Sequence, residues 1–170
     1  MSGSKNQSRP IFLYGDDIDT DRIIPGKYTK TLDRRELAAH VFEDLDPTFR
    51  INVQKGDIVV AGHNFGCGSS REQAAIAIQE AGVAVVIARS FARIFFRNAI
   101  NVGLPLLEIS DHTIAADARL SYDLSEGRVI DHQADRVYLV TALPPFLRAI
   151  MDAGGLVPYL REHGRYPSFT

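Results

Sequence analysis

The side chains best suited to chemistry follow one glycine-rich stretch, Gly62–Gly68. Ser69, Ser70 and Arg71 come directly after it, and a helix is predicted to begin at about Ser70. The first turn of a helix has free backbone N–H groups that attract anions. A guanidinium can also bind a carboxylate through two parallel hydrogen bonds. These residue types at this spacing indicate a binding site for a carboxylate.

A structural interpretation of the same turn is equally open on spacing. Ser69 and Glu72 fit a capping box, in which the serine caps the helix and the glutamate reaches back. Arg71 favours a ligand, because a cation in the first helical turn opposes the helix dipole by roughly 0.3–1 kcal/mol. The two interpretations are compatible. The stretch is not a nucleotide loop, since the P-loop lysine is missing and Arg71 stands where a dinucleotide fingerprint needs glycine or alanine.

Cys67 is the only cysteine of the chain. It excludes an intrachain disulfide, and also a cysteine-ligated zinc site or iron–sulfur cluster, because these need three or four ligands. The loop would favour a thiolate, but no base is adjacent in sequence, so we interpret Cys67 as a small loop residue. The five histidines show no metal-ligand spacing. We therefore predict no metal bound by this chain.

The segments that must position these residues alternate between strand and helix patterns. Helices are expected over about 33–43, over about 70–80 and from 90 onward, and buried strands over 11–14, 57–61, 83–88 and 104–109. This alternation predicts a parallel sheet covered by helices. From 113 to 141 the pattern changes to short strands with a hairpin turn at Glu126-Gly127, which would form a second layer on the same core. Terminal helices are expected over 144–153 and 156–162.

Length and composition indicate one folded domain of a water-soluble protein. The 170 residues are 45% hydrophobic and 24% charged, which suits a single core. We expect that domain over residues 11–170, after a disordered polar tail over 1–10 without a secretory signal. The net charge of −2 gives no basis for binding nucleic acid or membrane, and no apolar run approaches the ~20 residues that span a bilayer. A cytoplasmic location is expected by default.

Three motifs in order resemble the swivelling domain of the aconitase superfamily. They are Asp19–Pro25, Gly66–Glu72 and Ser90–Asn98, and the resemblance extends over roughly residues 11–165. It is closest to the small subunits of 3-isopropylmalate dehydratase and homoaconitase. The resemblance implies an α/β fold with three layers, β/β/α, and a large partner subunit holding a [4Fe–4S] cluster that acts as a Lewis acid. The single cysteine agrees that this chain does not hold the cluster.

The resemblance also implies roles for individual residues. Ser69 resembles the catalytic base, Ser70 and Arg71 resemble ligands of a substrate carboxylate, and Asp21 resembles an acidic residue that supports the site. The implied reaction dehydrates and rehydrates a 2-hydroxy or 3-hydroxy dicarboxylic acid, foremost the isomerisation of 2-isopropylmalate and 3-isopropylmalate in leucine biosynthesis. A serine hydroxyl is a weaker acid than a tyrosine hydroxyl, and lowering even the tyrosine pKa of ~10 to 7 would need about 4 kcal/mol. The N-terminus of a helix stabilises an anion by only ~2 kcal/mol. We therefore expect Arg71 and groups across the subunit interface to help activate Ser69.

The glycines of the turn and a second loop complete the predicted site. Gly66 and Gly68 are expected to support the turn. In the resembled family the loop that contains Tyr28, Lys30 and Thr31 selects the far end of the substrate. Members that accept a far carboxylate have arginine at the third position of this loop motif, and isopropylmalate enzymes usually have an apolar residue. Lys30 departs from both, and it either pairs with a carboxylate as a point charge or points to solvent.

Three alternatives remain. The chain could be the small subunit of a related enzyme with another substrate, homoaconitase or 2,3-dimethylmalate dehydratase. It could also be a stand-alone anion-binding or regulatory module, or a structural subunit whose loop only caps a helix. The absence of clustered basic residues in the sequence argues against RNA binding. An iron–sulfur partner and hydratase activity on reconstitution would favour the enzyme.

Overall fold

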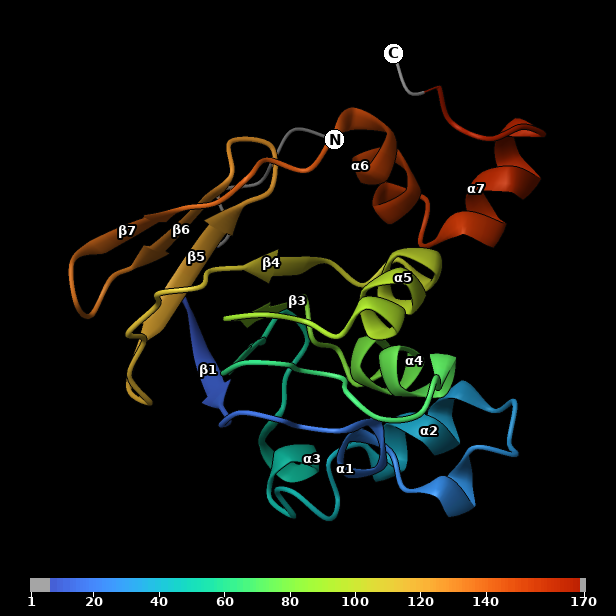
Figure 1. Cartoon of the computed structure of the whole chain (residues 1–170), viewed down its shortest axis with the longest axis horizontal. Coiled ribbons are helices and arrows are strands. Elements are labelled where there is room, and N and C mark those ends of the chain that lie inside the picture. Colours follow the sequence, from blue (N-terminus) through green and yellow to red (C-terminus); the bar gives the residue numbers. More distant parts are fainter. Residues whose placement is uncertain (1–6, 169–170) are drawn as a thin grey trace.

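A computed structural model describes residues 7–168, which fold around a seven-stranded mixed sheet (Figure 1). The strands lie in the order β4-β3-β2-β1-β5-β6-β7. The parallel part consists of β1 (Arg9–Leu13), β2 (Ile58–Ala61), β3 (Val85–Ala88) and β4 (Leu106–Glu108). The antiparallel part consists of β5 (Arg119–Asp123), β6 (Arg128–Asp131) and β7 (Arg136–Leu139).

The first strand belongs to both parts of the sheet. Residues 11–13 of β1 pair in parallel with 58–60 of β2, whereas residues 9–10 pair antiparallel with 119–120 of β5. The boundary expected for the N-terminal tail was therefore too late, because Arg9 and Pro10 are part of a strand. The rest of the expected tail, residues 1–6, lies outside the described residues.

The helices cover one face of the parallel strands, and the antiparallel strands lie on the opposite side (Figure 1). The helical segments are α1 (Thr20–Ile23), the 3₁₀ turn η1 (Gly26–Tyr28), α2 (Arg34–His40), α3 (Phe49–Asn52), α4 (Glu72–Glu80), α5 (Arg93–Val102), α6 (Pro145–Asp152) and α7 (Leu156–His163). None of the helices within residues 7–168 is long and apolar enough to cross a bilayer.

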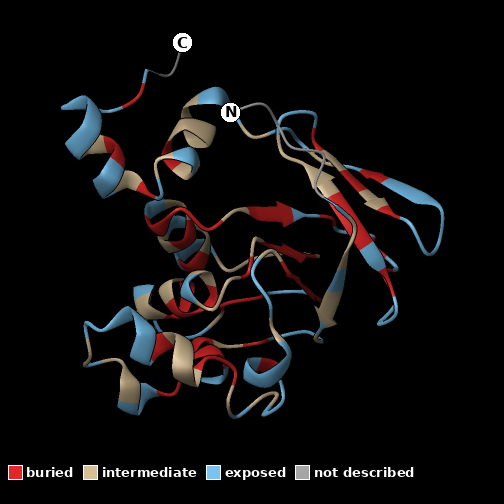
Figure 2. Ribbon diagram, turned by 180° about the vertical axis from the view of Figure 1, so that it is seen from behind, coloured by how far each residue is buried: buried red, intermediate tan, exposed pale blue. Residues whose placement is uncertain are grey.

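Side chains of the parallel strands alternate between two hydrophobic cores. Val59 and Val86 pack with the helices, whereas Val60 and Ile87 pack with Leu120, Val129 and Tyr138 of the antiparallel strands. Both faces of β2 and β3 are thus buried (Figure 2). The expected β/β/α layers are confirmed. The expectation of one shared core was wrong, because the two-residue period of a strand sends its apolar side chains to opposite faces.

Element boundaries differ from the expectations by a few residues. Helix α4 begins at Glu72 and α5 at Arg93, each later than expected, and α2 ends at His40. The four-residue helices α1 and α3 were not predicted, because so short a segment carries no helical periodicity. The hairpin turn at Glu126-Gly127 is confirmed: β5 pairs with β6 across it, and Gly127 has φ +64°.

Candidate active site

The glycine-rich loop after β2 is hydrogen-bonded to the loop after β1. The backbone N–H of Thr20 donates to the carbonyl of Cys67 at 2.9 Å, and that of Gly66 donates to Ile18 at 2.8 Å. Asp19 and Cys67 form an isolated parallel bridge. Because parallel strands β1 and β2 are neighbours, the loops at their carboxyl ends meet at one edge of the sheet. This pairing brings two of the predicted motifs together.

Asp21 and Arg71 form an ion pair where the two loops meet. The guanidinium Nη1 of Arg71 donates to the Asp21 carboxylate in a short contact. The Arg71 side chain is only 20% exposed, whereas that of Asp21 is 63% exposed. Both hydrogen bonds of the Arg71 guanidinium within residues 7–168, to Asp21 and to the carbonyl of Ile24 at 3.5 Å, use Nη1. The remaining N–H groups of the guanidinium are the donors that a second anion needs.

Ser69 and Ser70 are exposed, and neither caps the following helix. Arg71 occupies the N-cap position of α4 with an extended backbone and makes no side-chain capping bond. The proposed capping box of Ser69 and Glu72 was therefore wrong. The physical reason is that the backbone of Ser69 is held by Thr20, whose hydroxyl donates to the Ser69 carbonyl at 2.9 Å. Ser69 thus lies three residues before the helix, which weakens the dipole support expected there.

Gly66 and Gly68 give the turn its shape in different ways. Both have positive φ, +80° and +90°, a conformation that favours glycine. A Cβ on Gly66 would lie 2.2 Å from Cγ of Phe95 on α5, whereas the nearest atom to a Cβ on Gly68 is Cβ of Asp19 at 3.5 Å. Gly66 therefore also permits close packing of the turn against α5.

The second predicted loop, residues 26–31, lies beside the ion pair of Asp21 and Arg71, and it is hydrogen-bonded to a different residue. A Cβ on Gly26 would lie 3.4 Å from Nη2 of Arg71 and 3.6 Å from the Asp21 carboxylate. Gln73 in the first turn of α4 donates from Nε2 to the carbonyl of Thr29 at 3.0 Å. The start of α4 therefore anchors this loop.

The three predicted substrate contacts of that loop have different environments. The ring of Tyr28 is half-buried and stacks on His40, with ring centroids 3.7 Å apart. The hydroxyl of Thr31 accepts a hydrogen bond from the backbone N–H of Asp33 at 3.1 Å. Lys30 is exposed. The structure brings Asp21, Arg71 and the loop backbone together, and it leaves Lys30 on the solvent side of that group.

The thiol of Cys67 is unsuited to act as a nucleophile. Burial, followed by the charges of Asp19 and Asp17, raises the pKa of the Cys67 thiol. The expectation that this loop would favour a thiolate was wrong, because burial and then the carboxylates of Asp19 and Asp17 raise the pKa of the thiol. Within residues 7–168, no three histidine, cysteine, aspartate or glutamate side chains gather as metal ligands.

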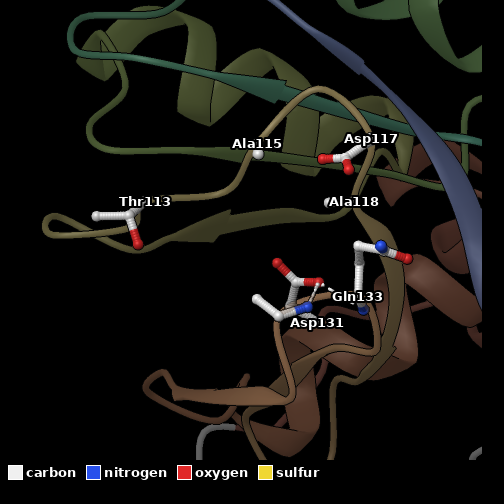
Figure 3. A pocket seen from close by; sticks show the side chains of 7 residues that line it. Thr113, Ala115, Asp117, Ala118, Asp131 and Gln133 are labelled. Carbon is white, nitrogen blue, oxygen red and sulfur yellow. Dashed lines mark hydrogen bonds between the residues drawn. The ribbon is translucent and has the colours of Figure 1, made fainter.

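A separate shallow pocket lies in the antiparallel part of the molecule (Figure 3). Thr113, Asp117 and Asp131 are among its lining residues. The Asp131 carboxylate accepts hydrogen bonds from the backbone N–H groups of Gln133 and Ala134, each at 3.0 Å. Its charge is thus already used by a turn. None of the residues that line this pocket belongs to the loops that carry Ser69 or Lys30.

Two residues that hold the site together were missed by sequence reasoning. Thr20 is 2% exposed and holds the Ser69 backbone, and Gln73 holds the Thr29 backbone. Thr20 lies within the motif Asp19–Pro25, which stands out in the sequence, but no role was predicted for this residue. A small polar residue between two aspartates is an ordinary loop pattern, and its burial follows only from the meeting of two distant loops.

Comparison with known proteins places this arrangement in a family. Residues 45–112 match the family described as the aconitase C-terminal domain, so fold and turn define a protein of the aconitase type. The 3-isopropylmalate dehydratase small subunit of Moorella thermoacetica is 52% identical over 86% of this chain and 90% of its own. That of Clostridium beijerinckii is 51% identical over 89% and 96%. The chain belongs to the family of 3-isopropylmalate dehydratase small subunits.

A solved structure supports the same assignment. The crystal structure titled 3-isopropylmalate dehydratase from Methanocaldococcus jannaschii has a TM-score of 0.86 and 44% sequence identity to this chain. The match covers 92% of this chain and 94% of the other. The resemblance inferred from three motifs is thereby confirmed, and it extends over nearly the whole fold.

Proposed function

We propose that this chain is the small subunit of a hydro-lyase that isomerises 2-isopropylmalate and 3-isopropylmalate by dehydration and rehydration in leucine biosynthesis. The observation that carries the proposal is the exposed turn of Ser69, Ser70 and Arg71, with Asp21 holding the arginine. Family membership at about half sequence identity supports it. We place the enzyme in the cytoplasm.

In this proposal each side chain of the turn has a separate task. Arg71 and Ser70 bind a carboxylate of the substrate, and Asp21 keeps the guanidinium oriented through Nη1. Ser69, which is exposed and free of a capping role, takes the proton beside that carboxylate. Tyr28, Lys30 and Thr31 belong to the loop that faces the far end of the substrate. A hydroxyl so far from a helix terminus needs further stabilisation of its anion, which an interface with another subunit would supply.

The remaining chemistry belongs to a large partner subunit. The relatives are named small subunits, and such a name implies a larger partner. A [4Fe–4S] cluster on that partner would polarise the substrate hydroxyl as a Lewis acid. The residues of this chain do not fit a cluster, because Cys67 is the only cysteine and its pKa is raised. This chain therefore contributes half of the active site.

The role of Ser69 is tested by Ser69→Ala in the reconstituted two-subunit enzyme. Turnover is expected to fall by about 10²–10⁴-fold, the usual contribution of general acid–base catalysis, while the complex still forms. Ser125→Ala is the matched control, because Ser125 is an exposed serine in the turn after β5 and its hydroxyl donates to Asp123. Full turnover by Ser69→Ala in the assembled enzyme would overturn the proposed role.

The substrate is tested by assaying the reconstituted enzyme with a panel of malate derivatives. Turnover of isopropylmalate is the expected result. Turnover of homocitrate or homoaconitate without isopropylmalate would identify a homoaconitase, and turnover of 2,3-dimethylmalate would identify a 2,3-dimethylmalate dehydratase. Lys30→Leu separates them further, because it removes a charge that only a far carboxylate would need.

A further inference from the structure

Thr20 is a buried polar side chain directly behind the predicted catalytic turn. It is 2% exposed. Its hydroxyl donates to the carbonyl oxygen of Ser69 at 2.9 Å, and its backbone N–H donates to the carbonyl of Cys67 at 2.9 Å. A Cβ on Gly68 would lie 3.6 Å from the Thr20 hydroxyl. One residue therefore bonds to the turn at Cys67 and at Ser69, the two residues on either side of Gly68.

The Thr20 hydroxyl has no part in starting its own helix. Asp19 is the N-cap of α1, and its side chain accepts from the backbone N–H of Arg22 at 2.9 Å. The hydroxyl of Thr20 instead reaches a residue 49 positions away in sequence. Burying a hydroxyl is costly unless it is hydrogen-bonded. The hydrogen bond to the Ser69 carbonyl offsets this cost.

That contact acts on the orientation of the Ser69 side chain. Ser69 and Ser70 are exposed, so neighbouring side chains do little to fix where the Ser69 hydroxyl points. Two hydrogen bonds from Thr20 hold the backbone around this residue. One is accepted by the Cys67 carbonyl before Ser69, and the other by the Ser69 carbonyl itself. A fixed peptide plane sets the direction of the Cα–Cβ bond. The same short helix also places Asp21 against Arg71.

We propose that Thr20 is a positioning residue for the reaction, which orients Ser69 through its carbonyl while its neighbour Asp21 orients Arg71. The inference rests on the proposed function, since it requires Ser69 to be the base. Thr20 does not touch the reacting atoms in this proposal. Its loss would therefore slow the proton transfer and leave the grip of Arg71 on the carboxylate unchanged.

The test compares Thr20→Val, Thr20→Ser and wild type in the reconstituted two-subunit enzyme. Valine has the shape of threonine without the hydroxyl, and it is expected to lower kcat by about 10–100-fold, since a small misplacement of reacting groups has this effect. KM should change less than threefold. Serine restores the hydroxyl and should keep kcat within about threefold of wild type. Thr48→Val is the matched control, because it also removes a hydroxyl donor, the one to Asp46, away from these loops.

Each outcome decides the proposal. Wild-type kcat in Thr20→Val would overturn it, and so would a kcat loss in Thr20→Ser as large as that in Thr20→Val. Should Thr20→Val not fold, Thr20→Ala is compared with Thr20→Ser, because the two variants differ only in the hydroxyl, and equal kcat values would then overturn the proposal. Ser69→Ala is measured alongside: if it is fully active, the proposed function fails, whereas an inactive Ser69→Ala with a normal Thr20→Val rejects Thr20 alone.

Discussion

Arg71 has one acidic partner among residues 7–168, and its remaining donors are suited to a second. Asp21 engages Nη1 of the guanidinium, and the arginine side chain is mostly buried while that of the aspartate is mostly exposed. Because the Asp21 end of the pair is open to solvent, the pair contributes only about 1 kcal/mol to stability. Its value therefore lies in orientation: a guanidinium already held on one side loses less freedom when a substrate carboxylate binds on the other.

Arg71→Lys tests whether the forked geometry is needed. The ammonium keeps the charge, but it is a point donor that cannot satisfy Asp21 and a bidentate carboxylate together. KM of the reconstituted enzyme is expected to rise about tenfold or more, with a free energy of unfolding within about 1 kcal/mol of wild type. Arg34→Lys, which alters the pair with Glu80 on the other end of α4, should leave KM unchanged. An unchanged KM in Arg71→Lys would contradict the assignment.

Gly66 and Gly68 offer a matched pair of substitutions within one turn. Both have positive φ, so alanine at either position is strained by about 1–2 kcal/mol. Only at Gly66 would the added methyl group overlap Phe95, which adds about 1–3 kcal/mol for overpacking. We expect Gly66→Ala to be the less stable variant in chemical denaturation. Equal losses of stability would show that backbone strain alone explains both glycines.

At the scale of elements, α4 is the part that joins the two loops of the site. Arg71 at its N-cap meets Asp21, and Gln73 two residues later donates to the carbonyl of Thr29. The loop of residues 26–31 and the turn of residues 66–71 are thus positioned by the same few residues. A displacement of the start of α4 would move both.

Gln73→Leu is expected to loosen the loop without unfolding the chain. The Thr29 carbonyl would lose its partner, which costs about 1–3 kcal/mol when such a group is buried. Hydrogen–deuterium exchange over residues 26–31 should become several-fold faster. Gln79→Leu is the control on the same helix, because Gln79 donates to Val102 at 2.7 Å and accepts from Arg34 at 2.8 Å. Its loss should affect the end of α5 and the start of α2 instead. Equal exchange over 26–31 in both variants would reject this anchoring role.

The elements between residues 57 and 109 were predictable because their signals are local. Continuous apolar runs such as Val83–Ala88 are typical of strands buried on both faces, and Gly82 separates one of them from the preceding helix. The start of α4 was not predictable from Ser69 and Glu72, since the capping pattern is overridden by the bond from Thr20, a residue distant in sequence. Order and direction of the strands likewise depend on contacts that no local pattern encodes.

The same distinction applies to the candidate site. The grouping of Ser69 to Arg71 could be read from their spacing, because they are neighbours in the chain. The ion pair of Arg71 and Asp21 spans 50 positions. Only the family resemblance pointed to Asp21 as a residue that supports the site. Thr20 and Gln73 were missed because their function is to hold a backbone carbonyl, and any polar side chain in a suitable place can do this.

At the scale of the whole molecule, His112, in the connection between β4 and β5, is bonded to the parallel strand β2. It is 4% exposed, and its Nε2 carries the proton donated to the carbonyl of Ala61 at 2.8 Å. Arg89 after β3 donates to the His112 carbonyl at 2.7 Å. The position of His112 is therefore structural.

The stability of the isolated chain should fall as the pH drops below the ordinary histidine range. Burial, more than any other effect, lowers the pKa of His112 from 6.5. The folded state therefore favours the neutral ring, and the unfolded state takes up the proton first. The contribution is fully present above pH 6.5 and is lost as the pH falls toward the lowered pKa. Denaturation of wild type and His112→Gln at pH 7 and pH 5 measures this. The variant should lose less stability on acidification, and parallel losses would contradict the assignment.

The strand β1 pairs with β2 through one half and with β5 through the other, and this arrangement has a consequence for biosynthesis. The ribosome releases β1 first, β2 some 45 residues later, and β5 only after more than a hundred residues. The parallel strands can therefore assemble around β1 during translation, whereas the half of β1 that pairs with β5 stays unpaired until β5 has been synthesised. A nascent chain stopped before residue 119 would carry an open sheet edge and an uncovered apolar face, Ile58, Val60, Val85 and Ile87. Such an intermediate is what chaperones recognise.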